Sequence, residues 1–132
     1  LDGFILLRRK DITELKAGKT NRFQQPILNH EGLLDQVDFD FRAPIESYGS
    51  FLADLSHDEI AIVEDELAEP QQFLIGTVSR VDGHAATINH FSGVGRLVEP
   101  KETITLARIT SCQIRTNYIQ IYQRHFERVK KL

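Results

Sequence analysis

Histidine, acidic and cysteine side chains are the groups in this sequence that could do chemistry. Asp82, His84 and His90 offer the donor atoms of a metal site, but the two histidines are six positions apart in a predicted hairpin, and no His-x-His or Cys-x-x-Cys pair occurs. Cys112 alternates with Gln113 on a predicted strand, so we expect its side chain to point inward as a small hydrophobic group. The spacing therefore predicts no metal, no cofactor and no nucleophile paired with a base.

Carboxylates are concentrated in the middle of the chain. Residues 23–69 hold twelve acidic residues and one basic residue, Arg42, whereas residues 1–22 hold six basic and three acidic residues and residues 70–132 hold nine and four. A solvated surface explains such a cluster, although the acidic segment could also neutralise its basic flanks. We therefore expect a protein that is not an enzyme and has no small-molecule substrate.

The composition is that of a folded domain. Hydrophobic residues make up 41% of the 132 residues and charged residues 27%, and no apolar run is long enough for a membrane span. A single cysteine cannot form an internal disulfide, which favours a reducing compartment. We expect a cytoplasmic, bacterial protein. Because the sequence lacks methionine, we also expect that residues upstream of Leu1 have been removed.

Short strands and two helices are predicted in the first half. Apolar runs and turn residues predict strands at residues 4–7, 11–16, 37–41 and 60–63. One helix should follow Thr20 or Asn21 and end before Gly32, and a second should follow Ser47.

The second half has the clearer β pattern. Strands are predicted at residues 73–81 and 85–90, joined by the Asp82–Gly83 turn, and at residues 103–106 and 111–115, with a bulge or a tight corner at residues 107–108 between the last two. A final helix should follow Thr116 or Asn117, with Tyr118, Tyr122 and Phe126 on one face. These elements predict a small, bent β-barrel over residues 70–132, preceded by an α+β unit over residues 1–69.

The start of the chain resembles its end. Residues 6–23 and residues 105–119 both contain a strand, an Ile-Thr pair, a Thr-Asn cap and a helix start. If this similarity is a true repeat, residues 1–69 contain a degenerate or partial second barrel.

Two motifs resemble the signatures of the Sm-like superfamily, which includes the LSm proteins and Hfq. Residues 75–82 read IGTVSRVD, with a hydrophobic residue before Gly76 and Asp82 six positions after it, and Ile114–Arg115 resembles the second signature. The resemblance covers residues 73–119 and implies an Sm-like or SH3-like barrel in which Gly76 bends a strand. Ala86 replaces the asparagine of the family, and Thr116 its second glycine.

The same resemblance implies an RNA site. His84 would stack on a base, Arg115 would close the nucleotide pocket and Asp82 would orient the loop, with Asn117 in the same set. Further contacts to phosphates would come from Arg80, Arg96 and Arg108.

Protein binding is the first expectation for function. The exposed edge strands of small barrels pair with other strands, so we expect a protein partner or self-association. The sequence thus predicts a β-rich α+β protein that serves as an interaction or oligomerisation module, with an atypical Sm-like RNA-binding protein as the alternative.

Overall fold

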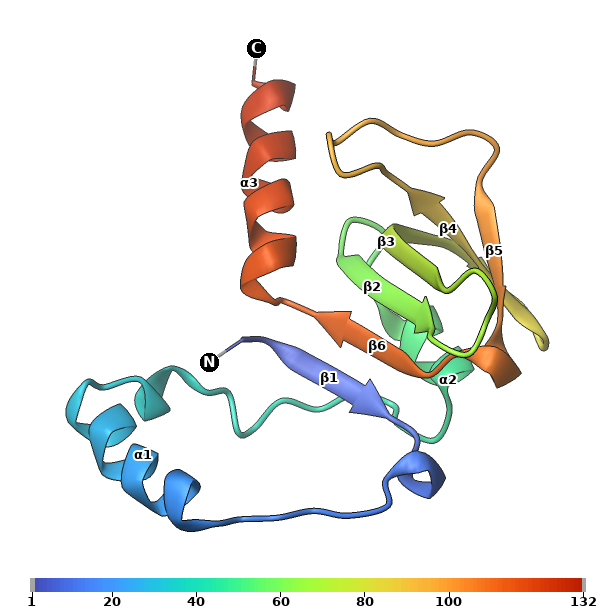
Figure 1. Cartoon of the computed structure of the whole chain (residues 1–132). Helices are drawn as coiled ribbons and strands as arrows, with labels where there is room; N and C mark the ends of the chain where they lie inside the picture. Colours follow the sequence, from blue (N-terminus) through green and yellow to red (C-terminus); the bar gives the residue numbers. More distant parts are fainter. Residues whose placement is uncertain (1, 132) are drawn as a thin grey trace. The chain divides into compact units, whose positions relative to one another are not determined.

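The computed structural model describes residues 2–131 and shows an α+β protein with three α-helices and a six-stranded antiparallel sheet (Figure 1). The chain divides into two compact units. One comprises residues 9–42, which we call the arm. The other comprises residues 2–8 and 43–131, which we call the body, and it contains the whole sheet.

The sheet has the strand order β1-β6-β2-β3-β4-β5. Its strands are β1 (Phe4–Leu7), β2 (Ile60–Asp65), β3 (Gln72–Val81), β4 (Ala85–His90), β5 (Glu102–Thr105) and β6 (Ser111–Ile114). Among residues 2–131 the sheet is open, with β1 and β5 at its edges and no closure into a barrel. Strands β1 and β2 belong to the same sheet as the later strands, and the expected boundary between residues 69 and 70 lies in the connection of the paired strands β2 and β3.

Strand β3 pairs with both β2 and β4, and it bends between the two pairings. Its residues 72–77 pair with β2, and its residues 76–81 pair with β4, with a register shift between Val78 and Arg80. Gly76 lies where the two pairings overlap. A Cβ atom on this residue would lie 2.7 Å from the carbonyl carbon of Asn89, so only glycine permits this approach of the two backbones.

The two faces of the sheet carry different helices. Ile60, Ile62 and Ile75 form a buried cluster with Phe91 and with Ile119 of helix α3 (Asn117–Lys130). Alternate residues of the same strands point to the opposite face. That face is next to helix α2 (Tyr48–Asp54), which contacts β3 and β4 and lies behind the strands in Figure 1. Burial of one such isoleucine contributes about 1.5–3 kcal/mol, so packing on the sheet stabilises α3.

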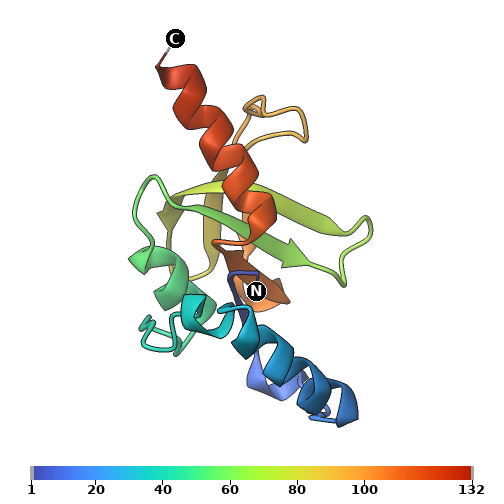
Figure 2. The ribbon, with the colours of Figure 1, turned by 90° about the vertical axis from the view of Figure 1, so that its left-hand side faces the viewer.

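Side-chain caps begin both helices of the body, as the sequence predicts. Ser47 Oγ accepts a hydrogen bond from the backbone N–H of Ser50 at 3.0 Å, and Thr116 Oγ1 accepts one from Ile119 at 3.2 Å. The C-terminal turns of α3 extend beyond the strands (Figure 2). Helices α1, α2 and α3, which are the α-helices within residues 2–131, are too short or too polar to span a membrane.

The arm contains helix α1 (Lys19–His30) between two short 3₁₀ turns, η1 (Arg9–Asp11) and η2 (Leu34–Gln36). The helix begins at Lys19 with Gly18 as its N-cap, so the predicted caps Thr20 and Asn21 lie inside its first turn, where Asn21 Oδ1 accepts a hydrogen bond from the N–H of Gly18 at 2.9 Å. The predicted strands at residues 11–16 and 37–41 are wrong, since the arm contains no strand within residues 9–42.

The wrong prediction at residues 37–41 has a local cause. Asp38 Oδ1 accepts a hydrogen bond from the N–H of Asp40 at 3.1 Å, and the Asp38 carbonyl accepts one from Phe41 at 3.3 Å. These bonds form a turn that competes with strand pairing. The other predicted strands are found with small shifts at their ends, and the predicted corner is the 3₁₀ turn η3 (Leu106–Arg108).

Candidate interaction surfaces

Two of the four residues expected at an RNA site lie at the β3–β4 turn. Asp82 Oδ1 accepts hydrogen bonds from the N–H groups of His84 and Ala85 at 2.8 and 2.9 Å. These bonds hold the pKa of Asp82 below its usual value. Asp82 therefore shapes the turn, and it leaves His84 exposed at the tip.

The other two lie where β6 meets α3. Arg115 has a positive φ of 57° and its Nε donates to Glu59 Oε1 at 3.1 Å. The backbone N–H of Asn117 donates to Asp2 Oδ1 at 2.6 Å. Thr116 is buried because it caps the helix. These residues therefore connect the start of α3 to the N-terminus of the body and to Glu59.

The structure groups the four residues in two pairs. Asp82 and His84 belong to the β3–β4 turn, whereas Arg115 and Asn117 belong to the β6–α3 junction, and the two places lie on opposite sides of the sheet in Figure 1. It does not bring all four residues into one pocket.

Arg108, expected to contact phosphate, pairs with a buried acid. Its Nε lies 2.6 Å from Asp65 Oδ2, and Asp65 Oδ1 accepts a hydrogen bond from the N–H of Leu67 at 3.1 Å. The side chain of Asp65 is only 3% exposed, against 56% for Arg108. The bond from Arg108 lowers the pKa of Asp65 although burial opposes this. The pair ties η3 to the end of β2.

Glu64 is the centre of a second polar group on the adjacent strands. Its Oε2 accepts a hydrogen bond from Ser111 Oγ at 2.7 Å and one from Gln113 Nε2 at 3.4 Å. In residues 2–131 no buried side-chain nitrogen or oxygen atom lacks a hydrogen-bond partner. The buried polar groups of the body are thus used for its own structure.

The histidines and the cysteine considered as metal ligands or as a nucleophile have structural surroundings instead. In the part of the chain that the structure describes, no three His, Cys, Asp or Glu side chains gather as metal ligands would. His90 Nδ1 accepts a hydrogen bond from the N–H of Ile75 at 3.3 Å. Cys112 is buried, and its burial, with a smaller contribution from Glu64, raises the pKa of the thiol to about 12.

The arm exposes its apolar side chains. No residue between 9 and 42 is buried, although the segment contains the large hydrophobic residues Leu15, Phe23, Ile27 and Phe39. Leu15, Phe23 and Phe39 are 87%, 72% and 75% exposed. Such side chains mark a contact surface when they share one segment.

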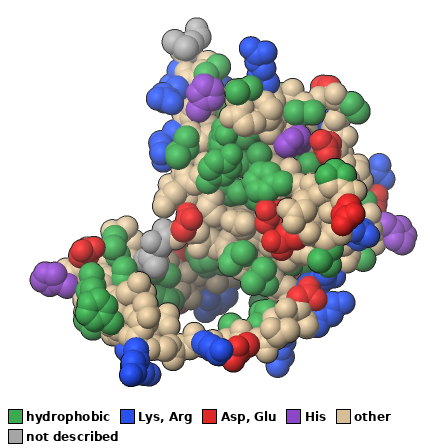
Figure 3. All heavy atoms as spheres, viewed as in Figure 1, with side chains coloured by type: hydrophobic (Ala, Val, Ile, Leu, Met, Phe, Trp, Pro, Cys, Tyr) green, Lys and Arg blue, Asp and Glu red, His purple; other side chains and the backbone are tan. Residues whose placement is uncertain are grey.

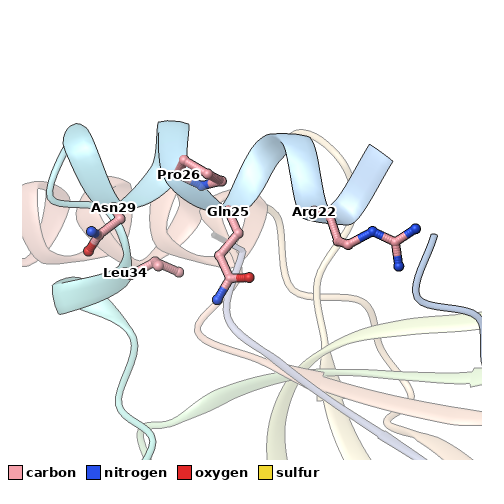
Figure 4. Close-up of a pocket in the computed structure, with 5 residues that line it drawn as sticks. All are labelled: Arg22, Gln25, Pro26, Asn29 and Leu34. Carbon is pink, nitrogen blue, oxygen red and sulfur yellow. The ribbon is translucent and has the colours of Figure 1, made fainter. Parts of the chain in front are cut away.

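A shallow hollow of about 630 Å³ lies within the arm, between α1 and η2 (Figure 4). Leu34 lines it from η2, and the lining residues of α1 are Arg22, Gln25, Pro26 and Asn29, of which Gln25 points down from the helix in Figure 4. Its only charged lining residue is Arg22, so it offers hydrogen-bond donors for a contact and no acid–base pair.

Helix α3 has a basic outer face. Arg124, Arg128 and Lys131 are spaced i, i+4 and i+7 on the side away from Ile119, and all three are exposed. We call these three residues the basic face. Figure 3 shows basic side chains along this helix and hydrophobic ones gathered between it and the strands. An exposed row of cations favours an acidic partner.

Sequence reasoning missed both surfaces. The predicted strands at residues 11–16 and 37–41 would have buried the arm, and the last helix was considered only for its apolar side. Local charge could have indicated them: residues 31–41 hold four acidic residues and no basic one, whereas residues 124–131 hold four basic residues and one acidic residue.

Comparison with protein-family models, with curated proteins and with solved structures finds no match to this chain.

Proposed function

We propose that this protein is a non-enzymatic interaction and oligomerisation module, and that the arm is its contact element. The observation that carries this proposal is that residues 9–42 hold large hydrophobic side chains and bury no residue.

The energetics of the arm support a partner. Ordering the backbone of one residue costs about 1–2 kcal/mol, and an isolated helix of 12 residues is marginal in water. Pro26 weakens α1 further, because a proline inside a helix removes one backbone hydrogen bond. Burial of Phe23 and Ile27 against a partner would contribute about 1.5–3 kcal/mol each, which is the kind of gain that such a helix needs.

The bonding of the reactive side chains supports a role without catalysis. The carboxylates of Asp65 and Asp82 are used by Arg108 and by backbone N–H groups. The Cys112 thiol has a pKa of about 12 and stays protonated at neutral pH. We also place the protein in the cytoplasm, and the unpaired cysteine supports a reducing compartment.

The proposal includes a relationship to the small Sm-like and SH3-like barrels. It is supported by the bend of β3 at Gly76 and by the sharing of β3 between β2 and β4. In this account β1 and β5 are the edges along which such a barrel remains open.

Sedimentation velocity of the full chain tests the function. We expect a mass above 15.1 kDa at high protein concentration, and a return to the monomer in the variant Phe23→Ser/Ile27→Ser. The variant Gln24→Ser lies on the same helix outside this apolar pair and should leave the mass unchanged. Dissociation by Gln24→Ser as well would show that any weakening of α1 has this effect and would count against a contact through Phe23 and Ile27.

RNA is the alternative partner. It is favoured by the exposed His84 and by the basic face of α3. Titration with short uridine-rich and adenine-rich RNAs over a salt series tests it. Binding that weakens in His84→Ala and in Arg115→Ala would favour RNA over a protein partner, and no binding at low salt would exclude it.

A further inference from the structure

We propose that the acidic half of the arm, residues 31–41, docks on the basic face of α3 in a second copy of the chain. This inference rests on the proposed function and names its partner.

The acidic half of the arm is charged and exposed. Its four acidic residues are Glu31, Asp35, Asp38 and Asp40, and all are exposed. Arg42, the next basic residue along the chain, lies 4.0 Å from Asp40, with both side chains largely in solvent, so this ion pair contributes little. Phe39, which is 75% exposed, lies between two of these acids. The segment therefore offers negative charge around one large apolar side chain.

The basic face has the complementary properties. Arg124 and Arg128 lie one helical turn apart, and Ile121, which is 56% exposed, precedes Arg124 by three positions on the same side of α3. Glu127 is the only acidic residue of the helix. The helix therefore presents cations beside the exposed side chain of Ile121. The acidic half of the arm likewise presents carboxylates beside the exposed side chain of Phe39.

A second copy of the chain offers a partner both for the acidic half of the arm and for the basic face of α3. Each chain contains one acidic half and one basic face, so in a twofold pair the same contact would form twice. RNA would cover the cations but would use neither the four acids nor Phe39. The charge pattern of the chain therefore favours self-association over RNA. Because the contact is between surface charges, we expect salt to weaken it.

Charge reversal tests the pairing. We expect Arg124→Glu/Arg128→Glu and Asp35→Lys/Asp40→Lys each to raise the dissociation constant of the dimer at least about tenfold at low salt, measured by sedimentation equilibrium. An equimolar mixture of the two variants should recover association, because a reversed arm then meets a reversed helix. The control Arg80→Glu/Arg96→Glu makes the same change in net charge as Arg124→Glu/Arg128→Glu, but elsewhere on the body, and should leave the constant unchanged.

Four outcomes overturn this inference. The first is a wild-type chain that stays monomeric at low salt. The second is a mixture of the reversed variants that does not associate. The third is a dimer that dissociates in Phe23→Ser/Ile27→Ser but is unaffected by both charge reversals, and this result leaves the proposed function standing. The fourth is a basic face whose reversal abolishes RNA binding without changing self-association, which assigns the face to RNA.

Discussion

Gly76 and Asn89 bring two backbones closer than any side chain would allow. A Cβ atom on residue 76 would clash with the Asn89 carbonyl and would lie 3.1 Å from the Cα atom of His90. This contact lets β3 leave β2 and continue along β4. The bend of the sheet therefore depends on the absence of one side chain.

Gly76→Ala should destabilise the body strongly. The added methyl group would have to displace backbone, and overpacking of this kind costs about 1–3 kcal/mol. Urea unfolding followed by circular dichroism measures the change. Gly83→Ala is the matched control, because a Cβ atom there meets nothing within 4 Å. We expect it to stay within about 0.5 kcal/mol of the wild type. Equal effects of the two substitutions would contradict the role of Gly76.

Asp65 should make stability depend on pH. Its pKa is lowered by Arg108, so its charged form is favoured in the folded protein. This contribution is present above the usual aspartate pKa of 3.8 and is lost as the pH falls through the lower folded value. Asp65→Asn should therefore lower the melting temperature at neutral pH, and the difference from the wild type should shrink below about pH 4. A difference that is constant from neutral to acidic pH would show that the ion pair is not its cause.

Cys112 should be unreactive until the protein unfolds. The thiol is buried and its pKa is about 12, whereas the unfolded thiol has a value of 9.0. Reaction with a chromogenic disulfide should be slow in buffer and fast in concentrated urea. The pKa is raised by folding, so the free energy of unfolding should fall as the pH rises above about 9. This fall should be smaller in Cys112→Val. Rapid labelling of the native protein would show that Cys112 is accessible.

The sequence predicts the elements of the body well because each is encoded locally. Short apolar runs predict β2 and β3, the Asp82–Gly83 pair predicts the turn that follows β3, and Ser47 and Thr116 cap helices α2 and α3. The sequence also predicts the bend at Gly76. The openness of the sheet could not be predicted, because it depends on which distant edges pair.

The arm escaped prediction for a different reason. Val37, Phe39 and Phe41 alternate with acids as a strand would, but a strand also needs a neighbour, and the turn at Asp38 forms instead. The expected RNA site was also only partly predictable from the sequence. Spacing along the chain related Asp82 and His84, which share one turn, but it could not show that Arg115 lies elsewhere on the sheet.

Hydrogen exchange at the backbone amides of α1 tests the central claim most directly. If the arm is ordered by a second copy, protection at residues 23–30 should rise with protein concentration, while protection in β2 stays high and constant. Protection of α1 that is absent at every concentration, or present and independent of concentration, would contradict the claim that α1 is stabilised by self-association.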